Sequence, residues 1–311
     1  MKRSMKSISL GLALFALVLS ACAKSTSSGT GGTPSPTPTG SFGVTKDAAI
    51  AAELPAAAVA KGTLVVATDA SYAPDEFIGP DNKTIVGMDI DLANAIAGVL
   101  GLKFNYVNAK FDTIITGVLG GRYDLSLSSF TDNLEREKTV DFVTYFQAGE
   151  AIFVAADSTA NYTSLDQLCG KPVSVESGTT ELDDINAQNP KCRAEGKPEI
   201  IKHVFPDQNA TNLDLISGHA VASLADSQVA AYQVKVTNGK VKVLTNYVAP
   251  APYGIVLPRP AGSAKGTGPL DKAILDALKK LIADGIYKQI LDKWGVAAGA
   301  ITTPTINGAT S

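Results

Sequence analysis

The chain is poor in the residues that usually hold metals and has no block of positive charge. It contains 3 cysteines and 2 histidines in 311 residues, and His203 and His219 lack the spacing of zinc ligands, so we expect no metal and no cofactor. Its 27 Lys and Arg side chains are dispersed among 30 Asp and Glu side chains, which argues against a nucleic-acid partner. No Ser–His or Cys–His arrangement for nucleophilic catalysis is visible either, so we do not expect an enzyme.

Long apolar runs are also lacking. The apolar stretch from Ile8 to Leu19 follows a basic start and is short for a membrane span, which is typical of a secretory signal. It ends in Leu19-Ser20-Ala21-Cys22, which resembles the bacterial lipobox, in which the cysteine is acylated. We therefore expect a signal peptide over 1–21 and a lipid on Cys22 that anchors the protein to the outer face of the cell membrane. The alternative is an ordinary signal peptide with a chance cysteine.

Residues 25–41 are almost entirely Ser, Thr, Gly and Pro, so they cannot form a core. We assign 22–45 to the lipid anchor and a flexible linker. If Cys22 is lipidated, Cys169 and Cys192 remain as a pair outside the cytoplasm, where a disulfide is the natural interpretation and two free buried thiols the alternative. Such a bridge would contribute roughly 3 kcal/mol of stability in the chain-entropy model.

The middle of the chain alternates between apolar strand patterns and helical periodicity. Residues 64–67, 104–107 and 123–128 favour strands, and 90–100 and 111–119 favour helices between them. The pattern restarts near Pro172, and the chain is helical again from 270 to 294. This alternation predicts βαβ units, hence an α/β fold with parallel sheets, and the length from about 61 to 296 suits two lobes.

Several motifs then resemble one family in the same order. The segment 87–97, Gly-Met-Asp-Ile-Asp-Leu-Ala-Asn-Ala-Ile-Ala, resembles the signature of the bacterial solute-binding proteins of family 3, the polar amino-acid receptors of ABC importers. Similar matches are seen at 68–74, 110–115, 128–136, 140–142, 170–173, 177–181 and 283–295. The sequence departs from the family at Met88, where the family usually has an aromatic or branched aliphatic residue, and at Asp75, where it usually has an aromatic one.

The resemblance implies a two-lobed periplasmic-binding-protein fold of type II, with two hinge strands and a ligand cleft between the lobes. We place lobe 1 at 61–151 plus 256–296, lobe 2 at 152–255, and a flexible tail at 297–311, with the chain crossing near 151–155 and 252–256. It also implies a monomer outside the cytoplasm that delivers an amino acid to an ABC permease in the membrane.

Arg136 is the central candidate for the binding site. A guanidinium holds a carboxylate through two parallel hydrogen bonds. Asp132 and Glu135 have the spacing of a capping box, which predicts that Arg136 lies in the first turn of a helix whose N-terminus favours an anion. Ser129 and Thr131 should lie at the carboxyl end of the preceding strand, where open α/β sheets bind ligands.

The resemblance assigns the remaining ligand contacts. Thr180 matches the threonine of the second lobe that touches the ligand carboxylate, and Asp226 matches the aspartate that receives the ammonium group. Tyr72 and Phe111 match the aromatic residues that sandwich the ligand side chain. Asp69 matches a position that can meet a polar or basic ligand tip.

Charge bounds the identity of the ligand. The candidate site offers Asp69 and Asp226 but one arginine, so a neutral polar or basic L-amino acid fits better than an acidic one. Two alternatives stay open: a cyclohexadienyl-type dehydratase on the same fold, with Glu176 or Glu181 as an acid, and a ligand-sensing lipoprotein that serves a signalling partner.

Overall fold

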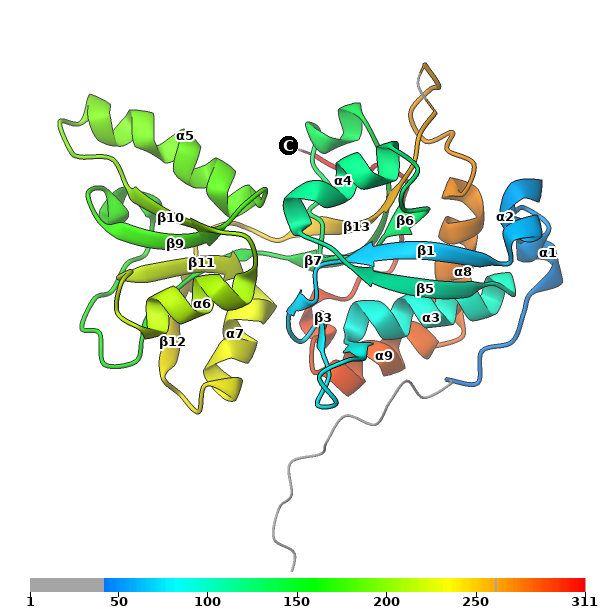
Figure 1. The fold of residues 1–311 in the computed structure, drawn as a ribbon, viewed down its shortest axis with the longest axis horizontal. Helices are drawn as coiled ribbons and strands as arrows, with labels where there is room; N and C mark the ends of the chain where they lie inside the picture. Colours follow the sequence, from blue (N-terminus) through cyan, green and yellow to red (C-terminus); the bar gives the residue numbers. More distant parts are fainter. Residues whose placement is uncertain (1–41, 261, 311) are drawn as a thin grey trace, which may run out of the picture. The chain divides into compact units, whose positions relative to one another are not determined.

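Two five-stranded sheets organise the computed structural model, which describes residues 42–260 and 262–310 (Figure 1). The first sheet has the order β5-β1-β6-β13-β7 and the second has the order β10-β9-β11-β8-β12. We call the described residues 42–148 and 251–310, which carry the first sheet, lobe 1, and residues 150–246, which carry the second, lobe 2. The lipobox, Cys22 and the expected tether up to residue 41 lie outside the described residues.

Lobe 1 is built from the predicted βαβ units. β1 runs parallel to β5 and β6, with Val66 opposite Tyr106 and Leu125, while β13 runs antiparallel to β6 and β7. A small antiparallel sheet, β2-β3-β4, follows β1. The strands of lobe 1 are β1 (Thr63–Thr68), β2 (Ser71–Tyr72), β3 (Glu76–Ile78), β4 (Ile85–Val86), β5 (Lys103–Asn108), β6 (Leu125–Ser126), β7 (Asp141–Ala148) and β13 (Ala251–Leu257).

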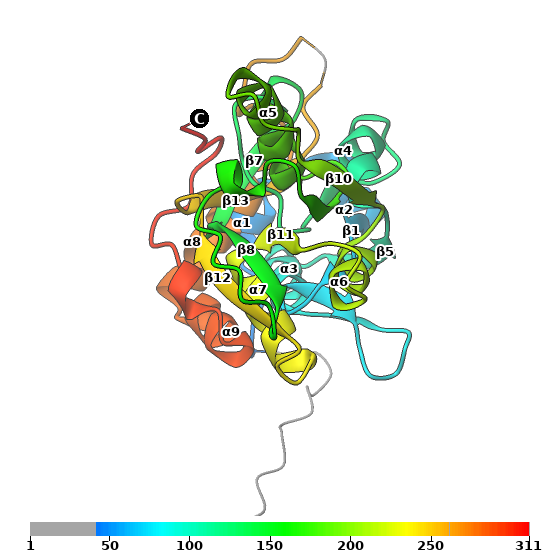
Figure 2. The ribbon, with the colours of Figure 1, turned by 90° about the vertical axis from the view of Figure 1, so that its left-hand side faces the viewer.

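Lobe 2 repeats the arrangement of lobe 1, with three parallel strands and two further strands joined by antiparallel pairing. β9 runs parallel to β10 and β11, and β8 runs antiparallel to β11 and β12. Figure 2 turns this lobe toward the viewer, with α5 above the strands and α6 and α7 below. Its strands are β8 (Glu150–Ala155), β9 (Pro172–Glu176), β10 (Ile201–Phe205), β11 (Ala222–Asp226) and β12 (Val241–Asn246).

The helices cover the sheets. Apolar side chains of α3, α8 and α9 form one cluster with lobe 1 strands, and α4 contributes to a second cluster on the other face of that sheet. The α-helices are α1 (Ala48–Ala51), α2 (Ala56–Lys61), α3 (Met88–Leu100), α4 (Phe111–Leu119), α5 (Thr180–Ala194), α6 (Gln208–Ile216), α7 (Ser227–Val236), α8 (Asp271–Ala283) and α9 (Ile286–Trp294). Short 3-10 helices are η1 (Arg136–Lys138), η2 (Leu165–Leu168) and η3 (Ala297–Gly299). Within the described ranges, no helix is both long and apolar enough to cross a membrane.

The chain crosses between the lobes earlier than the sequence suggested. β7 ends at Ala148 and β8 begins at Glu150, so the first crossing is at Gly149. The return lies between β12 and β13, at residues 247–250. All of β13 therefore belongs to the sheet of lobe 1, whereas the expected boundary at 255/256 divides it. The apolar pattern of a strand does not reveal which of the two sheets the strand joins.

Both ends of the described chain also differ from expectation. Phe42 and Val44 pack against the lobe 1 core, although 22–45 was assigned to a linker. Residues near the C-terminus were expected to form a flexible tail. Instead Asn307 donates its side-chain amide to Asp141 at 2.8 Å and accepts from the backbone N–H of Phe142 at 2.9 Å. Polar pairing of this kind cannot be read from a Thr/Gly/Pro composition.

The disulfide joins Cys169, which follows η2, to Cys192 in α5, with the two Cα atoms 5.8 Å apart. This is the pairing proposed from the sequence. The bridge closes a segment that contains β9 and most of α5, so it holds together the part of lobe 2 that carries several candidate site residues.

Candidate functional site

Arg136 of lobe 1 reaches across to lobe 2. Its Nη1 donates to the backbone oxygen of Thr131 at 2.8 Å, and its Nη2 donates to the backbone oxygen of Gly178 at 3.0 Å. The guanidinium also lies over the rings of Phe111 and Phe130, 5.5 and 5.1 Å from their centroids. These contacts fix the orientation of the planar donor group at the junction of the lobes.

Gly178 is needed for this approach. Its φ of +82° lies in the region that side chains rarely adopt, and a Cβ there would lie 2.8 Å from Cβ of Asp112 in lobe 1. Beside it, Ser177 donates its hydroxyl to Asp112 at 2.9 Å. The loop that precedes α5 is therefore shaped to meet lobe 1 closely.

The expected capping box is wrong. Arg136 begins the three-residue helix η1, and its backbone N–H is accepted by the side chain of Asn133 at 2.8 Å. Asp132 instead accepts the backbone N–H of Gly308 at 2.7 Å. The Asp132 side chain does not cap the helix because the C-terminal segment, distant in sequence, supplies it with a hydrogen-bond donor. Any anion site here depends on the guanidinium and not on an α-helix N-terminus.

Ser129 and the signature helix are directly connected. Ser129 has a φ of 51°, an unusual value for a residue other than glycine, and its backbone N–H donates to Asp89 at 3.1 Å. Asp89 is fully buried and also accepts the hydroxyl of Tyr145 at 2.7 Å. The acidic residue of the signature thus holds the strained strand end. The Ser129 hydroxyl lies 3.2 Å from Asp75.

Thr180 is the first residue of α5, but it is not the cap. Thr179 is the N-cap, and its hydroxyl accepts the backbone N–H of Leu182 at 3.3 Å. The Thr180 hydroxyl lies beside the Glu150 carboxyl, where it opposes the effect of burial on the pKa of that acid. Thr180 therefore has no capping role in α5.

Asp226 ends β11 and lies opposite Glu150 in the register of β11 and β8. The Tyr253 hydroxyl lies beside the Asp226 carboxyl and opposes the effect of burial on its pKa, and Gln228 donates its side-chain amide to the same hydroxyl at 2.7 Å. Burial, followed by the nearby Glu150 carboxyl, raises the pKa of Asp226 well above its ordinary value. A cation placed beside this carboxyl would favour its ionised form.

The two aromatic candidates do not lie face to face. Tyr72 and Phe111 are both buried, with ring centroids 5.7 Å apart and a nearly perpendicular arrangement. Phe111 stacks instead on Phe130, at 4.1 Å and an interplanar angle of 17°. Tyr72 and Phe111 are in contact in this structure, so a ligand side chain between them requires the rings to separate.

Four buried carboxyls lie near Arg136 or Tyr72, and we call them the cleft acids: Asp69, Glu176, Glu181 and Asp226. Burial is the main cause that raises the pKa of each, to about 6 for Asp69, about 10 for Glu176 and about 8 for Glu181. The Arg136 guanidinium lowers the pKa of Glu181 and Asp226 only in part. Lys110, which lines a hollow together with Asp69, is exposed.

A second acidic group lies beneath Ser129 and was not recognised from sequence as part of the site. Asp75, Glu76 and Asp89 are all fully buried, and burial together with mutual repulsion raises the pKa of Asp75 to about 8. Asp75 was noted only as a departure from the family pattern. Glu150 and Gln228 were also missed, because a single sequence does not show which polar residues are buried.

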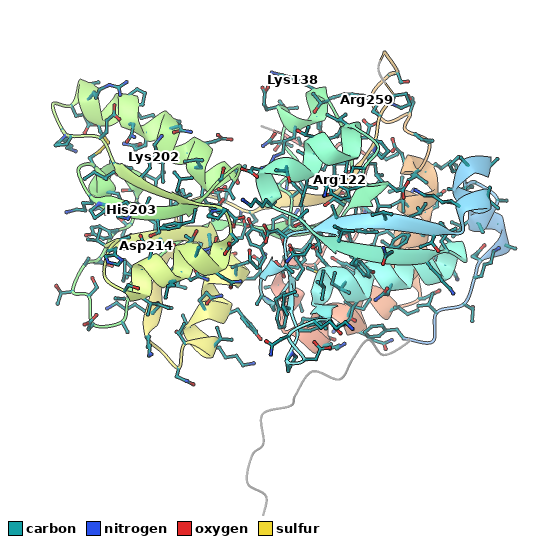
Figure 3. All side chains as sticks on the ribbon, in the orientation of Figure 1. Arg122, Lys138, Lys202, His203, Asp214 and Arg259 are labelled. Atoms are coloured by element: carbon teal, nitrogen blue, oxygen red, sulfur yellow. A yellow bond between two sulfur atoms is a disulfide. The ribbon has the colours of Figure 1, made fainter. Side chains whose placement is uncertain are left out.

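Elsewhere in lobe 2, a serine, an aspartate and a histidine lie together without forming a catalytic arrangement. Figure 3 labels His203 and Asp214 on neighbouring elements. Ser174 donates to Asp214 at 2.5 Å and His203 contacts the same carboxylate oxygen at 2.9 Å. The carboxylate stands between the hydroxyl and the imidazole, so the histidine cannot accept the serine proton.

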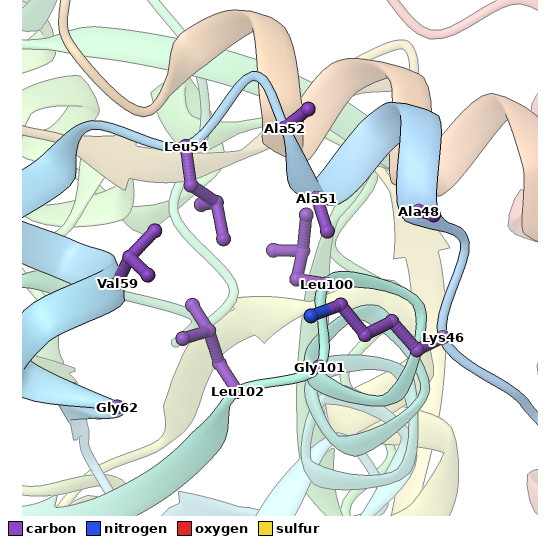
Figure 4. Close-up of a pocket in the computed structure, with 10 residues that line it drawn as sticks. All are labelled: Lys46, Ala48, Ala51, Ala52, Leu54, Val59, Gly62, Leu100, Gly101 and Leu102. Atoms are coloured by element: carbon purple, nitrogen blue, oxygen red, sulfur yellow. The ribbon is translucent and has the colours of Figure 1, made fainter.

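A hollow of about 500 Å³ lies at the far end of lobe 1, between α1, α2 and the end of α3 (Figure 4). Leu54, Val59, Leu100 and Leu102 line it, and Lys46 is its one charged lining residue. It lacks the paired charges that an amino acid requires, so we do not assign it to the ligand.

The fold and the cleft agree with the comparison against known families. Residues 64–297 match the family described as bacterial extracellular solute-binding proteins, family 3. The chain belongs to this family, and its two-lobed α/β fold is the one expected.

Individual relatives are amino-acid-binding proteins. The arginine-binding protein ArgT of Corynebacterium glutamicum is 32% identical over 261 residues, which cover 83% of this chain and 82% of ArgT. An ancestral arginine-binding protein solved with arginine is 34% identical, with a TM-score of 0.67, and covers 75% of this chain and 98% of its own. An ancestral arginine-binding protein was also solved with glutamine, at 33% identity and a TM-score of 0.68, covering 76% and 98%.

Proposed function

We propose that this protein is the substrate-binding component of an ABC importer and that it binds a basic L-amino acid, with L-arginine as the first candidate. In this proposal Arg136 and Thr180 hold the ligand carboxylate, assisted by Ser129 and Thr131. Asp226 receives the ammonium group. The side chain passes Tyr72 and Phe111 toward the remaining cleft acids.

One observation carries the preference for a basic ligand: the cleft acids outnumber the basic side chain they surround. Asp69, Glu176, Glu181 and Asp226 are each less than a tenth exposed, and the Arg136 guanidinium lowers the pKa of two of them, Glu181 and Asp226. A buried carboxylate is costly unless it is paired or protonated. A ligand with two positive groups and one negative group relieves this excess, while glutamate would increase it. The arginine-binding relatives support the same choice.

A direct binding assay tests the proposal. The purified protein, unfolded and refolded to remove bound solutes, would be titrated calorimetrically with arginine, lysine, ornithine, glutamine, cystine and glutamate. We expect saturable binding to be tightest for arginine or another basic amino acid, and a ligand at a hundred times its Kd to stabilise the fold by about 2.7 kcal/mol. Tightest binding of glutamate, or binding of none of them, would contradict it. In the second case, incubation with prephenate and a scan for aromatic product would test the dehydratase alternative.

The placement of the protein in transport has its own test. We expect the lipid anchor on Cys22 and an amino-acid permease as partner. Loss of radiolabelled arginine uptake in cells that lack this gene, and its recovery with the intact gene, would support transport. Unchanged uptake together with altered arginine-dependent gene expression would favour a sensing role instead.

A further inference from the structure

Among the cleft acids, Glu176 is the one whose two carboxyl oxygens are both buried and lack a hydrogen-bond partner among the described residues. It ends β9, the strand between β10 and β11, at the carboxyl edge of the lobe 2 sheet, where open α/β sheets bind ligands. Its side chain is 1% exposed, and neither carboxyl oxygen has a hydrogen-bond partner among the described residues. Buried polar groups are nearly always paired, so an orphaned buried carboxyl indicates that a partner is brought from outside.

The surroundings of Glu176 limit what that partner can be. The hydroxyl of Tyr72, from the opposite lobe, lies beside it, and this hydroxyl is also buried and without a partner of normal geometry. The charged groups that act most on Glu176 are Asp69, Glu181 and Asp207, all acidic. A group that enters here meets carboxyls and a phenol, so it must be a hydrogen-bond donor and is best positively charged.

Asp69, to which the sequence assigned the ligand tip, is less available. Its Oδ1 accepts the hydroxyl of Ser71 at 2.6 Å and its Oδ2 accepts the backbone N–H of Phe111 at 3.1 Å. Both oxygens thus hold parts of lobe 1 in place, at the start of α4 and in the loop after β1. Asp69 shapes the cleft wall, whereas the carboxyl of Glu176 is uncommitted.

The remaining two cleft acids already have a cation acting on them. The Arg136 guanidinium acts on Glu181 and on Asp226, and the Tyr253 hydroxyl lies beside Asp226. The larger charged influences on Glu176 are all acidic. In the proposed function Arg136 takes the ligand carboxylate and Asp226 takes its ammonium group, so the cation left to meet Glu176 is the one at the distal end of the ligand.

We propose that Glu176 determines specificity by pairing with the distal cation of the bound amino acid, together with the Tyr72 hydroxyl. This inference rests on the proposed function and names the residue that separates a guanidinium or ammonium tip from a neutral one. Without a ligand, burial and then Asp69 raise the pKa of Glu176 to about 10, so the carboxyl keeps its proton at neutral pH. A cationic ligand tip replaces that proton.

Glu176→Gln tests this directly, with L-arginine and its neutral isostere L-citrulline as probes. We expect the wild-type protein to prefer arginine by tenfold or more. Glu176→Gln should lose at least tenfold in arginine affinity while its citrulline affinity is unchanged or higher. Glu176→Asp keeps the charge and should retain part of the preference for arginine. Glu195→Gln, exposed on the same lobe, is the matched control and should behave as wild type.

Proton release gives a readout that a merely structural role would not move. Calorimetry at pH 7.5 in buffers of different ionisation enthalpy should show protons released when arginine binds, and fewer in Glu176→Gln. Circular dichroism of the ligand-free variants verifies that they fold.

The outcomes separate the two proposals. Equal arginine affinity in wild type and Glu176→Gln would overturn the role of Glu176 and leave the proposed function intact. An equal loss of arginine and citrulline binding would also overturn it. If wild type binds neither probe nor any basic amino acid, the proposed function and this inference both fail.

Discussion

Gln228 of α7 donates its side-chain amide to the Asp75 carboxyl at 2.6 Å, and this hydrogen bond joins lobe 2 to lobe 1. The same amide nitrogen lies 2.7 Å from the Tyr253 hydroxyl. In the family that the sequence resembles, the position of Asp75 is usually aromatic. In this chain the position carries a buried carboxyl that joins the two lobes through Gln228.

Removing the bridge should weaken ligand binding. Gln228→Leu eliminates the donor and leaves Asp75 buried without its partner, and hydrogen bonds to buried acidic groups contribute about 1.5–3 kcal/mol. Because the bond forms only when the lobes approach, we expect a loss of roughly tenfold or more in arginine affinity, measured by calorimetry. Gln289→Leu, exposed on α9, is the control. Unchanged affinity in Gln228→Leu would show that the bridge does not contribute to closure.

Arg136 should not tolerate lysine. Lysine keeps the charge but loses the planar fork that contacts Thr131 and Gly178, so we expect Arg136→Lys to reduce arginine affinity at least tenfold and Arg136→Ala to abolish binding. The matched control is Arg122→Lys, since Arg122 is exposed and also lies over an aromatic ring, that of Tyr123 (Figure 3). Wild-type affinity in Arg136→Lys would mean that charge alone suffices.

Asp89 should be required for stability as well as for the site. Asp89→Ala leaves the backbone N–H of Ser129 and the hydroxyl of Tyr145 buried without their acceptor, at about 1–3 kcal/mol for each group. Urea unfolding should therefore show a clear loss, in contrast to Asp292→Ala at an exposed ion pair. Equal stability of the two variants would indicate that Ser129 keeps its conformation without Asp89.

Stability without ligand should decrease as pH rises. Burial is the main cause that raises the pKa of Asp75 and Glu181 to about 8, of Glu150 to about 9 and of Glu176 to about 10. Between the unfolded value near 4 and these values, the folded state binds more protons than the unfolded state, so each carboxyl reduces stability as pH rises. We expect the Tm of the ligand-free protein to fall from pH 5 to pH 9.

The matching variant is Glu176→Gln, which removes one of these carboxyls and should make the decline shallower. Saturating arginine should do the same, because the bound cation favours the ionised acids. A Tm that is constant or rises over this pH range would contradict the assignment of the cleft acids as protonated groups.

Periodicity predicted most of the regular elements because each has a local cause. The helical periodicity from 270 to 294 is confirmed by α8 at 271–283 and α9 at 286–294. The alternation of strands and helices predicted the α/β class correctly. What failed depends on contacts between distant segments. The Asp132–Glu135 spacing predicted a cap, but the backbone N–H of Gly308 donates to the Asp132 side chain instead. The first crossing lies at Gly149 and not at 151–155, because β7 and β8 are bonded into different sheets.

For the same reason, the sequence indicated some residues of the candidate site and not others. Arg136 and Asp226 could be named from residue type and position in the family pattern. Asp75, Glu150 and Gln228 could not, because they are polar residues whose importance comes from burial and from partners on other elements. Glu176 is intermediate: the sequence suggested it as an acid, and the unpartnered carboxyl of the folded chain indicates where a cation would be accepted.

The most direct test of the account is the competition between arginine and citrulline for the refolded wild-type protein, measured by isothermal titration at pH 7.5. The account predicts saturable binding of one arginine, at least tenfold tighter than citrulline and with protons released to the buffer. Equal affinity for the two, or tighter binding of citrulline, would contradict the central claim that the buried acids of the cleft select a cationic amino acid.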